Sequence, residues 1–134
     1  MKPQITISSL DAERLEDLIG ALRPDDATGQ ALLDELARAD IVAPEDMPSD
    51  VVTMHSTVRF AIAGSGEVRS LTLAYPKDMA QLPDGISILS PIGAALLGLS
   101  VGDTIDWPHP DGQLLKVRLL EVVYQPERAG EYFR

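Results

Sequence analysis

Two adjacent carboxylates, Asp25 and Asp26, are the residues of this sequence that come closest to a metal-binding pair. They lie in the segment 23–29, whose proline, glycine and aspartate content is typical of a turn. Because Mg²⁺ often takes one or two protein carboxylates plus water or phosphate oxygens, the pair could hold one divalent cation weakly. Aspartate is also common in turns and at helix N-termini. From the residues alone, turn chemistry and a functional acid pair both stay open.

The other residues that could do chemistry do not form a recognisable catalytic set. His55 and His109 lie far apart, and neither has a second histidine within metal-ligand spacing, which favours ordinary polar roles at strand ends. Ser87, Ser90 and Ser100 lack the G-x-S-x-G setting of a hydrolase nucleophile. The chain has no cysteine, which excludes disulfides, thiolate nucleophiles and cysteine-ligated zinc. We therefore expect no catalytic centre, no cofactor and no resident metal.

The most specific pattern lies in the segment 87–103. Ser90 followed by Pro91 is a helix N-cap followed by the residue favoured at the first helical position, and a short apolar run ends at a glycine. A corner of this kind brings Leu89, Ser90, Pro91 and Ile92 together, and these four residues are a candidate contact patch for another protein. A purely structural corner explains the same residues.

Two short amphipathic helices are predicted before residue 40. Between Ser8 and Leu22 the apolar residues recur at three- and four-residue spacing, with acids in the first turn, where the helix dipole favours them. A second stretch, roughly Gln30 to Ala39, repeats the pattern. Because about seven residues separate the two stretches, we predict a short antiparallel helical hairpin, a coiled coil in miniature. The lead-in around Ile5 and Ile7 is either a short strand or an extended segment.

The hydrophobic period changes to two beyond a linker rich in proline and acids at 41–48. A glycine-rich turn at 64–66 predicts a hairpin between its flanking strands, and one short helix is expected at 91–98. Strands are predicted at 51–54, 57–62, 67–75, 104–107 and 114–124. The fold class is therefore α+β, with a helical hairpin over 1–43 and a bent antiparallel β domain with one short helix over 44–134.

The net charge is −10, from 21 acids and 11 bases, and no basic face for nucleic acid phosphates is visible. A basic protein partner, or simple solubility, fits this charge better. The longest near-apolar run, 92–101, falls well short of the ~20 residues of a membrane span, and the start lacks the apolar stretch of a secretory signal. We expect a soluble, cytoplasmic monomer that contacts neither membrane nor nucleic acid directly.

The segment 87–103 resembles the C-terminal signature of the GreA and GreB transcript-cleavage factors, whose C-terminal domain is FKBP-like. From about Ile5 to its end, the chain resembles the Rnk regulators of nucleoside diphosphate kinase, a branch of the same superfamily. The resemblance to the cleavage factors extends through Gly102–Asp103, Pro110–Gly112 and Val117–Tyr124. The resemblance to the Rnk regulators is carried by Asp50–Met54, Gly66–Arg69, Pro91–Gly98, Tyr124–Glu127 and Ala129–Gly130.

The resemblance implies a protein that binds RNA polymerase near its secondary channel through the FKBP-like domain, in competition with other channel-binding factors. In the cleavage factors, residues at and just before the Ser-Pro step contribute to docking, and here these are Leu89, Ser90 and Pro91. Leu89 departs from the family pattern, which has a polar or acidic residue there, so apolar packing would have to replace that contact.

The cleavage factors also carry a much longer coiled coil, whose acidic tip supports a metal ion in the polymerase active site. Helices of about 10–13 residues reach only ~15–20 Å, so Asp25 and Asp26 would stop short of that centre. Our hypothesis is a non-enzymatic regulator that occupies the channel entrance.

Three alternatives stay open. The first is a cleavage factor that uses Asp25 and Asp26. The second is a prolyl isomerase, suggested by the FKBP-like fold, although the aromatic content of 4% provides few rings for such a cleft. The third is an interaction module for another partner, such as the kinase in the family's name, for which no residue indicates direct contact.

Overall fold

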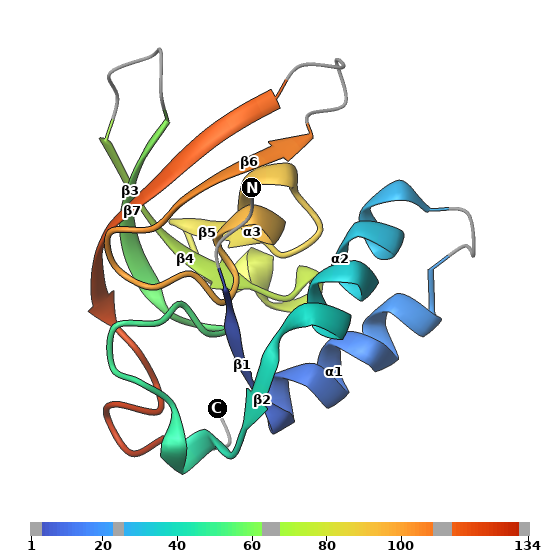
Figure 1. Ribbon diagram of the computed structural model, residues 1–134, viewed down its shortest axis with the longest axis horizontal. Coiled ribbons are helices and arrows are strands. Elements are labelled where there is room, and N and C mark those ends of the chain that lie inside the picture. Colours follow the sequence, from blue (N-terminus) through green and yellow to red (C-terminus); the bar gives the residue numbers. More distant parts are fainter. Residues whose placement is uncertain (1–3, 23–25, 63–67, 109–113, 132–134) are drawn as a thin grey trace.

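The computed structural model describes residues 4–22, 26–62, 68–108 and 114–131, and it has the α+β composition that the sequence predicts (Figure 1). Its helices are α1 (Ser9–Gly20), α2 (Ala27–Arg38) and α3 (Pro91–Leu96), with 3-10 segments η1 (Pro44–Asp46) and η2 (Pro76–Gln81). Its strands are β1 (Thr6–Ser8), β2 (Asp40–Val42), β3 (Thr57–Ile62), β4 (Val68–Ala74), β5 (Gly85–Ser87), β6 (Thr104–Pro108) and β7 (Leu114–Tyr124).

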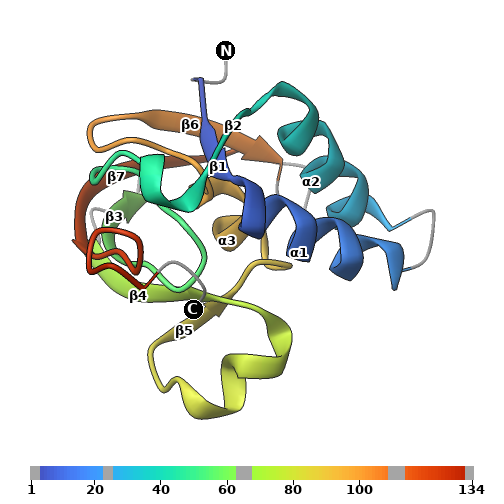
Figure 2. The same cartoon turned by 90° about the horizontal axis from the view of Figure 1, so that it is seen from below.

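The main sheet has the strand order β5-β4-β3-β7-β6. Its pairs β3–β4, β3–β7 and β6–β7 are antiparallel, as predicted. The prediction of a wholly antiparallel sheet is wrong at one edge, because η2 carries the chain back so that β5 runs parallel to β4. Register shifts between β3 and β7 mark bulges, which increase the local twist, and the sheet curls around α3 (Figures 1 and 2).

The predicted strand at 51–54 is also wrong. Only Val51 forms a bridge, with Ser100, while Val52 exchanges backbone hydrogen bonds with Leu99 and Gly98 at 2.9 and 3.0 Å. All four residues of the segment are buried, whereas a strand with one solvent face would alternate between buried and exposed positions. The apolar content of this segment reflects burial on all sides rather than membership of a sheet.

The helices α1 and α2 lie side by side in both views (Figures 1 and 2). Each begins at an N-cap: the Ser8 hydroxyl accepts a hydrogen bond from the Asp11 amide at 3.1 Å, and the Asp26 carboxylate accepts one from the Gly29 amide at 2.9 Å. The cap at Asp26 starts α2 three residues earlier than the sequence pattern indicated.

A small parallel sheet attaches the chain start to the rest of the protein. β1 pairs with β2, which shows that the segment around Ile7 is a strand and places part of the predicted linker in a second strand. The Thr6 amide donates to the Gly98 carbonyl at 3.3 Å, which joins β1 to the end of the α3 segment.

One hydrophobic core contains side chains from both halves of the chain. Leu15 and Ile19 of α1 and Leu32 of α2 are buried in the same cluster as Phe60 and Leu119 of the sheet. The apolar faces of the helices therefore pack against the β-rich part as well as against each other, and this contact fixes where the free ends of α1 and α2 project. Among the described residues, no helix has the length and apolar character needed to cross a membrane.

Candidate partner-binding surface

The loop before α3 is held in one shape by short local hydrogen bonds. The Ser90 hydroxyl donates to the Ser87 carbonyl at 2.7 Å and accepts from the Gly93 amide at 3.0 Å. The Ser87 hydroxyl accepts from the Leu89 amide at 3.1 Å. Pro91 occupies the first helical position, as predicted, so both the cap and the proline favour the start of α3 at this point.

Gly93 is required by close packing in this loop. A Cβ atom added there would lie 2.1 Å from the Ser87 carbonyl oxygen, a separation that real Cβ atoms essentially never show. Because this oxygen belongs to the backbone of β5, no side-chain movement can remove the collision. The loop between β5 and α3 is therefore fixed at both ends.

The structure brings the predicted contact residues Leu89, Ser90 and Ile92 together within one turn. Leu89 and Ile92 are half-buried and pack against the core, so part of each apolar side chain remains at the surface. The Ser90 hydroxyl already uses its hydrogen in the bond to Ser87. A partner at this surface would therefore meet mainly apolar contacts.

Of the two acids predicted at the turn, Asp25 lies outside the described residues and Asp26 is the N-cap of α2. The capping bond to the Gly29 amide gives Asp26 a structural role that needs no metal. Within residues 4–22, 26–62, 68–108 and 114–131, no three His, Asp or Glu side chains are grouped so that they could share an ion.

A buried polar contact between α1 and the loop after residue 50 was not predicted. The Asp11 carboxylate is only 3% exposed and accepts a hydrogen bond from the Met54 amide at 3.1 Å. Desolvation raises the pKa of Asp11 to about 6, because burial disfavours its charged form. The Met54 amide lowers this pKa, Glu127 raises it, and Arg14 and His55 lower it.

His55 lies beside this contact and takes a backbone conformation unusual for a residue with a side chain. Its φ angle is +68°, in the left-handed region. The ring Nε2 lies 3.0 Å from a carboxylate oxygen of Asp78, and the ring meets Tyr75 edge-on with centroids 5.6 Å apart. A groove of about 720 Å³ opens here, lined in part by Arg14 and Leu18 of α1.

Sequence reasoning gave His55 an ordinary polar role, and nothing in its spacing from Asp78 could have indicated this pairing. His109 lies outside the described residues. Burial, followed by the nearby Asp11 carboxylate, raises the pKa of Tyr75 above its usual value, so its hydroxyl stays protonated across the physiological range.

The β-rich part of the chain is similar to a known class of proteins. The family model described as "Transcription elongation factor, GreA/GreB, C-term" matches residues 47–124, which include the corner before α3. The chain is also 36% identical over 80 residues to transcription elongation factor GreA of Dehalococcoides mccartyi, a match that covers 60% of this chain and 51% of that protein. The β-rich part is therefore of the GreA/GreB C-terminal class.

The more specific similarity extends over almost the whole chain. The model described as "Rnk N-terminus" matches residues 3–42. The chain is 47% identical over 134 residues to the regulator of nucleoside diphosphate kinase of Escherichia coli (strain K12), covering 98% of this chain and 97% of that protein. This chain belongs to the Rnk family, within the GreA/GreB superfamily.

A solved structure of a prokaryotic transcription elongation factor GreA/GreB from Nitrosomonas europaea has 54% sequence identity to this chain. The alignment covers 92% of this chain and all of that one, with a TM-score of 0.71. The GreA/GreB-like fold is thus shared over both the helices and the sheet.

Proposed function

We propose that this chain regulates transcription by binding RNA polymerase near its secondary channel and competing there with Gre-type factors, without stimulating transcript cleavage. Membership of the Rnk family and the GreA/GreB C-terminal match support the choice of partner. The β-rich part, 44–134, provides the docking surface through Leu89, Ser90, Pro91 and Ile92, which we call the docking corner. The helical part, 1–43, forms a short hairpin that occupies the channel entrance.

The length of the helices is the observation that carries the proposal. α1 and α2 have 12 residues each, so at the rise of an α-helix each extends for about 18 Å. A pair of this length blocks an entrance but does not carry an acid through a channel to a distant catalytic centre. Occupancy alone then excludes longer factors from the same site.

The cleavage-factor alternative depends on Asp25 and Asp26 at the turn. In the structure the Asp26 carboxylate caps α2, which accounts for an acid at this position. The prolyl isomerase alternative depends on aromatic rings that face an open cleft. Phe60 and Trp107 are instead buried in the core, and Tyr75, which lines the groove beside α1, is 5% exposed.

The test is direct binding to core RNA polymerase, followed by competition with a Gre-type factor. We expect the wild-type chain to bind, and the Gre-type factor to displace it as its concentration rises. Leu89→Ser should weaken binding about fivefold or more, because an apolar contact at the docking corner is lost. Val123→Ser is the matched control, since Val123 is 48% exposed on β7 and lies outside the corner.

Circular dichroism on both variants shows whether either substitution unfolds the chain. Absence of wild-type binding to polymerase would overturn the proposal. Binding that a Gre-type factor does not disturb would overturn the shared site.

A further inference from the structure

The C-terminal end of α1 and the N-terminal end of α2 project away from the sheet (Figure 1). A second groove lies between these two ends. We call it the tip groove. It has a volume of about 430 Å³, within the range of sites that hold a ligand or a side chain. Its lining includes Ile19, Leu22, Gly29 and Leu33, with the acids Glu16 and Asp26 also present.

The apolar lining of the tip groove is not all needed for the core. Leu32 of α2 is fully buried in the hydrophobic core, but its neighbour Leu33 is 40% exposed. Gly29 contributes no side chain to the lining, and a Cβ placed there would be in ordinary van der Waals contact with Leu22 Cδ1 at 3.4 Å and Ile19 Cγ2 at 3.5 Å. An apolar side chain of a partner can fill the volume beside the exposed part of Leu33.

The charge of this chain indicates which kind of partner segment would carry the apolar side chain that enters the groove. Residues 1–50 hold twelve of the 21 acids and four of the 11 bases, a net charge of −8, whereas residues 51–134 have a net charge of −2. Glu16 and Asp26 place two of these acids at the groove itself. Nucleic acid phosphates would be repelled, and a segment rich in Lys and Arg would be attracted.

We infer that the tip groove is a receptor for one apolar side chain presented by a basic segment of the protein partner. This inference rests on the proposed function and makes the partner a part of RNA polymerase. The docking corner attaches the β-rich part to polymerase, and the tip groove provides a second, separate contact with polymerase at the end of the helices. The acids guide the approach, and the apolar lining provides affinity once water has left the groove.

The first experiment tests the apolar part with a matched pair of variants. Leu33→Ser removes the exposed leucine of the groove, and Val68→Ser removes a 53% exposed valine on β4. We expect Leu33→Ser to raise the Kd for core polymerase about fivefold and Val68→Ser to leave it within twofold of wild type. Both positions are exposed, so both variants should fold, which thermal unfolding checks.

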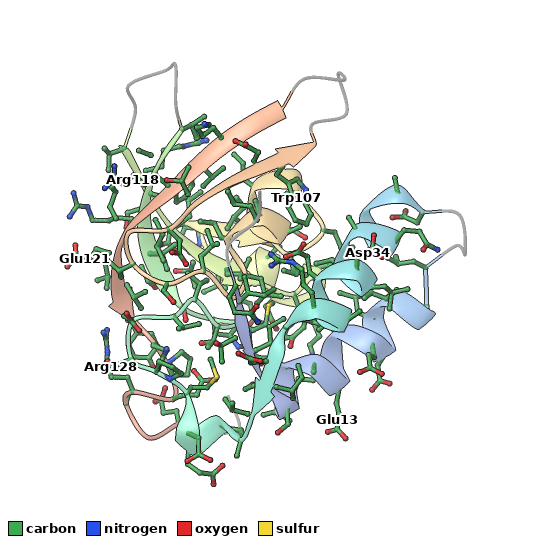
Figure 3. The ribbon with its side chains drawn as sticks, in the orientation of Figure 1. Glu13, Asp34, Trp107, Arg118, Glu121 and Arg128 are labelled. Carbon is green, nitrogen blue, oxygen red and sulfur yellow. The ribbon has the colours of Figure 1, made fainter. Side chains whose placement is uncertain are left out.

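The second experiment tests the charge. Glu16→Lys reverses an acid in the groove, and Glu13→Lys makes the same change one helical turn earlier, at an exposed position outside the groove lining (Figure 3). We expect Glu16→Lys to slow association about fivefold at low salt and to flatten its salt dependence, with a clearly smaller effect for Glu13→Lys.

The outcomes separate the two proposals. If wild type fails to bind polymerase, both are wrong. If wild type binds and Leu89→Ser weakens binding, but Leu33→Ser and Glu16→Lys behave like their controls, the tip groove is overturned and the proposed function stands.

Discussion

The helices α2 and α3 begin with the same local motif but use it differently. In each, the side chain of the N-cap residue accepts a hydrogen bond from the amide of a glycine three residues on: Asp26 from Gly29 at 2.9 Å, and Ser90 from Gly93 at 3.0 Å. A Cβ at Gly93 would lie 2.1 Å from a backbone oxygen, whereas one at Gly29 would find nothing nearer than 3.4 Å.

A cap residue and a glycine three positions on, seen in the sequence, therefore do not reveal how much space surrounds the glycine. At α3 the glycine allows strand and helix to meet without a gap, which makes the docking corner rigid. At α2 the glycine leaves room for a methyl group in ordinary contact with Leu22 and Ile19. One helix start leaves no space beside its glycine, and the other leaves enough for a methyl group.

The largest effect should come from Gly93→Ala. The added methyl group collides with the Ser87 carbonyl, so β5 and α3 must separate, and we expect a loss of at least about 3 kcal/mol in the free energy of unfolding. Urea unfolding of the variant against wild type measures it. A loss below about 1 kcal/mol would show that the corner is looser than its contacts indicate.

The second effect concerns the attachment of α1 to the rest of the protein through Asp11. Its pKa is raised to about 6 in the folded chain from an ordinary 3.8, so the folded state binds a proton more readily than the unfolded state. The stability that this group contributes is fully present below pH 3.8 and is lost as the pH rises through 6.

Through this group, the unfolding free energy of wild type should fall by about 2 kcal/mol between pH 4 and pH 7. Asp11→Asn should not show this fall. Because the other titrating groups are common to both proteins, the difference between their unfolding free energies across this range isolates Asp11. Parallel pH profiles for the two proteins would contradict the burial of this carboxylate.

The third effect compares the two caps. Ser90→Ala and Asp26→Ala should each cost about 1 kcal/mol of unfolding free energy, the usual cost of a lost N-cap. Ser90→Ala should be the more costly, since its hydroxyl also donates to the Ser87 carbonyl. Denaturant unfolding of both variants measures the two losses. A larger loss for Asp26→Ala than for Ser90→Ala would contradict the tighter start of α3.

The smallest effect should come from Gly29→Ala, with the opposite sign to Gly93→Ala. Alanine loses less backbone freedom on folding than glycine does, and the space at Gly29 admits its methyl group. We expect a gain of about 0.5 kcal/mol in thermal or denaturant unfolding. A loss of 1 kcal/mol or more would mean that α1 and α2 already fill the groove.

The elements predicted well from the sequence are those set by neighbouring residues. The Ser90–Pro91 step placed the start of α3, and the period of two placed β3, β4 and β7, because caps and alternation act over a few positions. The three-residue strand β2 and the parallel pairing of β5 with β4 were missed, since the parallel partners are brought together by the path of the chain.

The site was less predictable than the fold. The contacts from Asp11 to Met54 and from His55 to Asp78 join residues 43 and 23 positions apart, and no local pattern encodes them. The tip groove depends on which of two adjacent leucines, Leu32 or Leu33, enters the core, and this is set by how α2 packs against α1 and α3. The docking roles of Leu89, Ser90, Pro91 and Ile92 remain a prediction, because they are defined by a partner's surface.

Binding to polymerase without stimulation of cleavage is measured on backtracked transcription complexes, in which RNA cleavage is followed with and without a Gre-type factor. We predict that this chain alone gives no cleavage above background and that it reduces factor-stimulated cleavage as its concentration rises. Asp26→Asn, which keeps a capping oxygen but removes the charge, should behave like wild type. Cleavage stimulated by the wild-type chain and abolished in Asp26→Asn would contradict the account, because an acid on these short helices would then be acting at the catalytic centre.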